Sequence, residues 1–68
     1  MDDEKLIQYL QGVIRKEKEM LPHPPSLVDT LRGRLIGLLH LAAFAELVTE
    51  DTRYEEIETK LKELIDEL

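Results

Sequence analysis

The chain has 68 residues and contains no cysteine, so it has room for one small domain and cannot use disulfides or cysteine-based zinc or redox sites. A domain of this size buries only about 60% of the surface that its unfolded form exposes, which leaves oligomerisation or regular helix packing as sources of stability. The net charge of −6 disfavours binding to the phosphate backbone of nucleic acids. Because the first residues are acidic and no apolar segment follows closely, we expect no secretory signal and a cytoplasmic location.

The first predicted element is an amphipathic helix over residues 3–20. Apolar residues recur at three- and four-residue spacing from Leu6 to Ile14, which is typical of one helix face. Acidic residues from Asp2 onward begin the helix and basic residues end it, as the helix dipole favours. Gly12 in its middle is either simply tolerated or marks a close approach by another backbone.

A proline-rich corner at residues 22–25 must end this helix, because each proline lacks an amide hydrogen and restricts the residue before it. Ser26 is expected to cap the next helix, with Asp29 as a weaker form of the capping-box partner three residues later. This second helix is predicted over residues 27–48. His23, within the corner, is expected to be exposed and without partners.

The most informative segment of the second helix is residues 35–48, which are apolar on nearly every side of a helical wheel. Such a helix must be covered on nearly every side, and a chain of 68 residues has little other material to cover it. The segment is shorter than the ~20 residues needed to span a bilayer and contains His40 and Glu46. We therefore expect a helix covered by protein and no membrane span.

Two surfaces can be separated on this helix. One suits the first and third helices of the same chain: Leu27, Leu31, Leu35, Leu38, Ala42 and Ala45. The other contains Gly33 and Gly37, a pair whose spacing lets two helix backbones approach closely. Either these glycines fit a neighbour within the monomer, or the chain associates with itself through this surface. We predict self-association through an interface of six residues: Gly33, Gly37, His40, Leu41, Phe44 and Val48.

The third predicted helix covers residues 53–67. Thr52 and Glu55 have the spacing of a full capping box at its start. Apolar residues then alternate at three- and four-residue steps, which is the seam of a heptad repeat: Tyr54, Ile57, Leu61, Leu64 and Leu68. Since 8 of the 15 acidic residues lie in residues 50–68, this helix offers an acidic face to a possible basic protein partner.

Short connections make consecutive helices antiparallel. The sequence therefore predicts a single all-α domain over residues 1–68, an antiparallel three-helix (up-down-up) unit with a long central apolar helix. We expect it to assemble into a homo-oligomeric helical bundle, as a dimer or a tetramer. The corresponding function is that of a small non-enzymatic binding, regulatory or adaptor protein.

Other functional interpretations rest on smaller groups of residues. The alternative is a weak nucleic-acid or phosphate binder that uses the basic residues of the first two helices: Arg15, Lys16, Lys18, Arg32 and Arg34. His40 is either a hydrogen-bonded structural residue or one of a pH-sensitive pair across a two-fold axis. Helical metal motifs, phosphate-binding loops and nucleophile motifs do not occur in the sequence, so we expect no metal, no cofactor and no catalytic residues.

Overall fold

The structure of the protein is a computed structural model and describes residues 3–68, in which helices are the only regular elements. They are α1 (Asp3–Glu19), α2 (Pro25–Thr49) and α3 (Arg53–Glu67). The prediction of an all-α chain is confirmed over this range, and each predicted helix boundary lies within two residues of the observed one. Asp2, expected to contribute to the acidic start of α1, lies outside the described residues.

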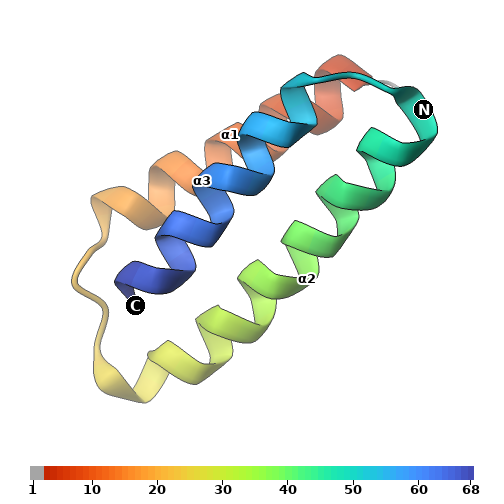
Figure 1. The fold of residues 1–68 in the computed structure, drawn as a ribbon. Coiled ribbons are helices and arrows are strands. Elements are labelled where there is room, and N and C mark those ends of the chain that lie inside the picture. The colour runs from red at the N-terminus through yellow and green to blue at the C-terminus, as the bar shows by residue number, and fades with distance from the viewer. Residues whose placement is uncertain (1–2) are drawn as a thin grey trace.

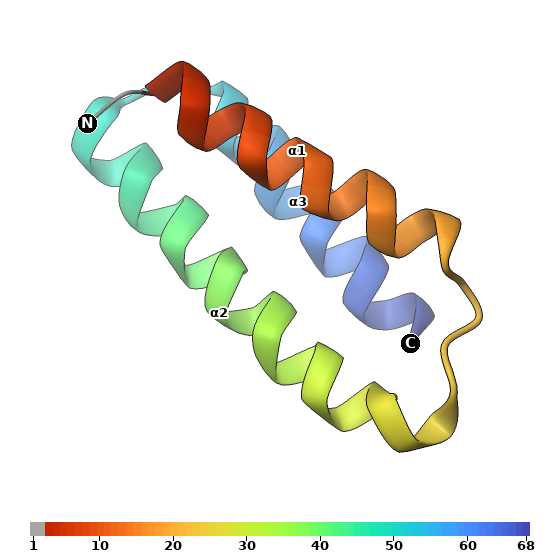
Figure 2. The ribbon, with the colours of Figure 1, turned by 180° about the vertical axis from the view of Figure 1, so that it is seen from behind.

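The three helices pack with their long axes close to one direction. α3 contacts both other helices and packs most extensively along α2. Figure 1 and the view from behind in Figure 2 show α1 and α3 side by side, with α2 running alongside this pair. The proline-rich corner joins α1 to α2 at one end of the molecule, and a short turn joins α2 to α3 at the other. The result is an elongated molecule with extents of 36 × 17 × 17 Å.

The hydrophobic core runs along the length of the molecule. α3 supplies four side chains that are each at most 1% exposed: Tyr54, Ile57, Leu61 and Leu64. Their burial confirms the heptad seam that the sequence predicts on this helix, and Leu68 at its end is partly buried against the same core. The other helices complete the core with Ile7, Leu10, Ile14, Leu35, Ala42 and Ala45.

The start of α2 differs from the sequence prediction. The helix begins at Pro25, and Pro24 occupies the cap position without a side-chain hydrogen bond. Proline suits the first helical position because the amides of that turn have no partner within the helix. Ser26 therefore lies inside the first turn, and its assignment as the cap is wrong.

The start of α3 also corrects a prediction. The side chain of Thr52 makes no capping hydrogen bond. Instead, Asp51 Oδ1 accepts a hydrogen bond of 3.0 Å from the backbone N–H of Arg53. The hydroxyl of Thr49 accepts one of 3.3 Å from the backbone N–H of Asp51. The capping carboxylate thus lies one residue earlier than the capping box predicts, because Asp51 accepts a bond from a free helix amide that Thr52 does not reach.

Gly12 lies in the middle of α1. A Cβ atom at Gly12 would have no neighbour within 4 Å, so no other backbone of the same chain approaches this glycine closely. None of the helices in residues 3–68 combines the length and the apolar character needed to cross a bilayer.

Candidate functional site

α2 presents its core-facing residues to α1 and α3 much as the sequence predicts. Leu35, Ala42 and Ala45 are buried, and Leu31 and Leu38 are half-buried. Leu27, expected on the same side, is 48% exposed. Its turn lies at the end of α2 that extends past the last residues of α3 (Figure 1), so little of the chain remains there to cover it.

The opposite side of α2 is exposed and largely apolar. Phe44 and Val48 are 62% and 60% exposed, Leu41 is 39% exposed, and Leu47 is the most exposed large apolar residue at 79%. We call this surface the outer face of α2 and define it by these residues: Gly33, Ile36, Gly37, His40, Leu41, Phe44, Leu47 and Val48. All six residues of the predicted interface belong to it. Ile36 and Leu47 were missed, although the nearly continuous apolar character of residues 35–48 could have indicated them.

The two glycines of the outer face have no packing role within the chain. A Cβ atom built on Gly33 or Gly37 would meet nothing within 4 Å. The interpretation that these glycines fit a neighbour within the monomer is therefore wrong. Each glycine lowers helix stability by about 1 kcal/mol relative to alanine, and no contact within the chain offsets that loss.

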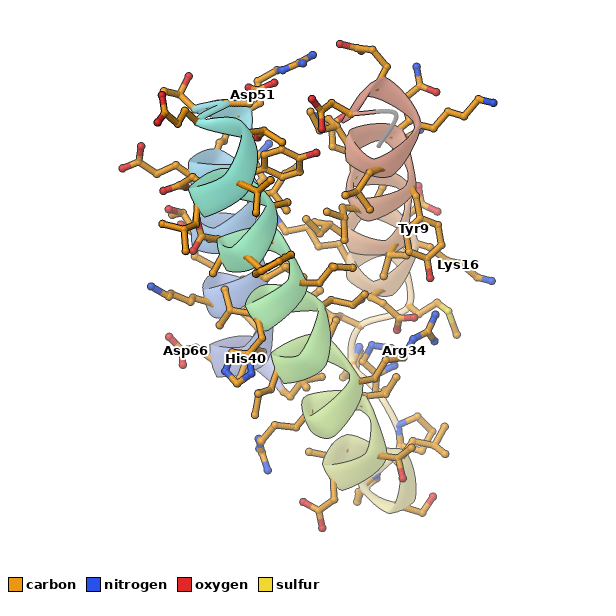
Figure 3. The ribbon with its side chains drawn as sticks, turned by 90° about the vertical axis from the view of Figure 1, so that its right-hand side faces the viewer. Tyr9, Lys16, Arg34, His40, Asp51 and Asp66 are labelled. Atoms are coloured by element: carbon orange, nitrogen blue, oxygen red, sulfur yellow. The ribbon has the colours of Figure 1, made fainter. Side chains whose placement is uncertain are left out.

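The outer face is nearly free of charge, and His40 is its only ionisable residue. Figure 3 shows His40 projecting from the side of α2 that is turned away from α1. Charged residues lie at the two ends of the face. Near the start of α2, Arg32 Nη1 lies 3.3 Å from Asp29 Oδ1, and after its last turn come the acidic residues Glu50 and Asp51.

The basic residues of the alternative prediction do not gather into one patch. Arg15 and Lys18 line a shallow groove of about 350 Å³ between α1 and α3, together with Lys60. Arg34 lies on the other side of α1, where its Nη1 is 3.9 Å from Glu17 Oε1, and Lys16 points away from α2 (Figure 3). Arg32 pairs with Asp29 on α2.

A polar cluster at the proline-rich corner corrects the prediction for His23. Its side chain is only 2% exposed, and its Nε2 lies 3.4 Å from Glu17 Oε2, an ion-pair distance without hydrogen-bond geometry. Glu17 is itself buried. This buried carboxylate was not predicted, although Leu10, Ile14 and Glu17 have the spacing of a single helix face. The cluster joins the end of α1 to the corner and to Arg34 of α2.

Two carboxyl groups meet between α2 and α3. Glu58 raises the pKa of Glu46, first as a hydrogen-bonding neighbour and also through its negative charge, and partial burial of Glu46 acts in the same direction. Oε2 of Glu46 is buried without a hydrogen-bond partner. This pair lies on the inner side of α2, away from the outer face, and was also missed.

The described residues hold no group of three His, Cys, Asp or Glu side chains that could bind a metal ion. Comparisons of the chain with protein-family models, with curated proteins and with solved structures give no match. The outer face of α2 is therefore the candidate site that the geometry itself defines.

Proposed function

We propose that the protein is a small non-enzymatic binding protein, a regulator or adaptor, that acts as a homo-oligomer assembled through the outer face of α2. One observation carries this proposal. Phe44, Leu47 and Val48 are each at least 60% exposed on the same side of one helix in a chain of 68 residues.

Burial of apolar area supports this proposal. Monomeric soluble proteins seldom expose a contiguous apolar surface of this kind, and such surfaces mark interaction sites. A symmetric dimer buries the same surface on both copies at once. The approach is open, because α2 lies in front of α3 with α1 to its side (Figure 3).

In this proposal the antiparallel up-down-up unit is the building block of a helical bundle in the cytoplasm. A dimer uses the outer face alone, and two dimers can join if Ile36 and Leu47 extend the contact. The acidic surface of α3 remains free in either assembly for a basic protein partner. The oligomer would then present at least two copies of that surface, which raises the avidity for a repetitive partner.

Sedimentation equilibrium tests the proposal directly. The wild-type chain should sediment as a dimer or tetramer at micromolar concentration. Gly37→Leu should shift it toward the monomer, because a bulky side chain blocks close approach while the intrinsic helix propensity rises. Gln8→Leu, which introduces the same leucine side chain at an exposed position of α1, is the control and should leave the assembly unchanged.

Two outcomes would contradict the proposal in different ways. A wild-type chain that remains monomeric at high micromolar concentration would refute self-association. A Gly37→Leu variant that remains fully oligomeric would show that another surface forms the contact.

The alternative function, weak binding of nucleic acid or phosphate, has one supporting observation, the groove that Arg15 and Lys18 share with Lys60. Binding through these cations should weaken steeply as salt is raised. Fluorescence anisotropy of a labelled generic oligonucleotide at low and at physiological salt distinguishes the two functions. Arg15→Gln combined with Lys18→Gln should abolish any such binding and leave the oligomeric state unchanged.

A further inference from the structure

We infer that two copies of this chain pair through α2 in antiparallel orientation, with Phe44 of each copy seated over Gly37 of the other and Val48 over Gly33. This inference rests on the proposed self-association and adds its orientation and register. The occupant of the outer face is a second copy of the same chain, because the face is complementary to itself in shape and the net charges at its two ends are opposite in sign.

Small and large residues follow a symmetric order along part of the outer face. The six residues of the predicted interface have the same spacing in either direction along α2: Gly33, Gly37, His40, Leu41, Phe44 and Val48. A two-fold axis between residues 40 and 41 therefore places Phe44 of one copy against Gly37 of the other, and Val48 against Gly33. Both glycines leave space on the helix surface for such a side chain, since a Cβ at either would meet nothing within 4 Å.

A parallel pair lacks this complementarity. It would set glycine against glycine at one end of the face and Phe44 against Phe44 at the other. Helices close enough to meet at the glycines would have to diverge at Phe44 and Val48, the more exposed end. Helices separated enough to accommodate Phe44 would leave a gap beside the glycines, and unfilled space forfeits packing energy.

Charge favours the same orientation. The first half of α2 carries Arg32 and Arg34 with one acid, Asp29. The end of α2 and the turn after it carry three acids, Glu46, Glu50 and Asp51, and one base, Arg53, which pairs with Asp51. Antiparallel pairing brings the basic end of one copy next to the acidic end of the other, and it also opposes the two helix dipoles. Parallel pairing would bring like charges together at both ends.

A size exchange across the interface tests orientation and register together. Gly37→Leu should prevent association, and Phe44→Ala should raise the dimer dissociation constant roughly 30-fold, as for a central aromatic contact. The double variant Gly37→Leu/Phe44→Ala should associate more tightly than Gly37→Leu alone, because each new leucine then faces an alanine. Gly37→Leu/Leu47→Ala is the matched control and should not recover, since Leu47 does not face residue 37 in this register.

Cysteine cross-linking gives a second measurement. Only the introduced cysteines can form the cross-link, because the chain has no cysteine of its own. A disulfide requires Cα atoms within about 7 Å. In the antiparallel pair the two copies of residue 48 are about 22 Å apart along the helices, whereas residue 48 faces residue 33 of the other copy. An oxidised equimolar mixture of Gly33→Cys and Val48→Cys chains, one carrying a mass tag, should form the mixed dimer, and Val48→Cys alone should not cross-link.

The outcomes separate the inference from the proposed function. If the wild-type chain dimerises, two results would overturn the antiparallel register and leave self-association intact. They are cross-linking of Val48→Cys with itself, and a double variant that associates no more tightly than Gly37→Leu. A dimeric wild-type chain in which neither cysteine experiment cross-links would overturn the register as well. A monomeric wild-type chain would refute the proposed function and the inference with it.

Discussion

Asp51 and Arg53 show how single side chains fix the turn between α2 and α3. The Asp51 carboxylate accepts hydrogen bonds from the guanidinium and from the backbone N–H of Arg53, and these bonds hold the pKa of Asp51 below its usual value. Arg53 also donates a bond of 2.6 Å to Glu4 Oε1 at the start of α1. Nearby, the hydroxyl of Tyr54 donates to Asp3 Oδ1 at 3.1 Å. The turn is thereby attached to the first turn of α1 at two points.

Substitution at Asp51 should therefore destabilise the protein more than substitution at Thr52. Asp51→Ala removes the carboxylate that caps α3 and orients Arg53, and we expect the thermal midpoint to fall by about 5 °C. Thr52→Ala removes a hydroxyl without a capping bond and should change the midpoint by less than half as much. Thermal unfolding followed by circular dichroism at pH 7 measures both. A larger effect at Thr52 would mean that the capping box forms after all.

The Glu46–Glu58 pair predicts a dependence of stability on pH. Because the folded chain holds the Glu46 proton more tightly than the unfolded chain does, the pair favours folding at acidic pH. That contribution is lost as the pH rises from the ordinary value of 4.5 through the raised pKa of Glu46. Glu46→Gln should consequently be more stable than wild type at pH 7, with a difference that shrinks as the pH is lowered toward 4.5.

Urea unfolding at several pH values measures this difference. Glu63→Gln, which removes a carboxylate from an exposed position of α3, is the control and should show no comparable gain at pH 7. If Glu46→Gln is less stable than wild type at pH 7, the two carboxyl groups do not oppose folding.

At the scale of helices, periodicity determines which parts of the structure can be predicted. α1 and α3 have one apolar face each, so their extent and their buried apolar residues follow from spacing alone. The ends of α2 are harder to predict, because proline fits the first turn of a helix as well as the corner before it. The cap of α3 was assigned to Thr52 because Thr52 and Glu55 have the spacing of a capping box. Asp51 is an equally suitable cap residue, and only the turn geometry selects it.

The seam of α3 predicts unequal effects of two alanine substitutions. Leu61 is fully buried between the helices, so Leu61→Ala should lower the free energy of unfolding by roughly 2–5 kcal/mol. Glu63→Ala, on the exposed side of the same helix, should change it by less than about 0.5 kcal/mol. Urea denaturation of both variants measures the difference. Equal effects would contradict the packing of α3.

At the scale of the whole molecule, the outer face of α2 was predictable and the polar clusters were not. Phe44 and Val48 lie on one side of a helix whose other side is needed for the core, and helical spacing shows this without a structure. The contact of His23 with Glu17 depends on the path of the proline-rich corner, and that of Glu46 with Glu58 on the register of α2 against α3. Such contacts between elements are set by tertiary packing and leave no periodic signal in the sequence.

If the folded protein is a dimer in which the outer face is buried, its thermal stability must depend on its concentration. Association with a second folded copy stabilises the native state by mass action, and each tenfold rise in concentration adds about 1.4 kcal/mol per mole of dimer. For a chain of this size we expect the thermal midpoint to rise by about 3–5 °C per tenfold increase. Gly37→Leu should lose this dependence, and Gln8→Leu should keep it. Calorimetry of the three chains from about 10 µM to 1 mM measures the slopes, and a wild-type midpoint independent of concentration would mean that the outer face stays in water.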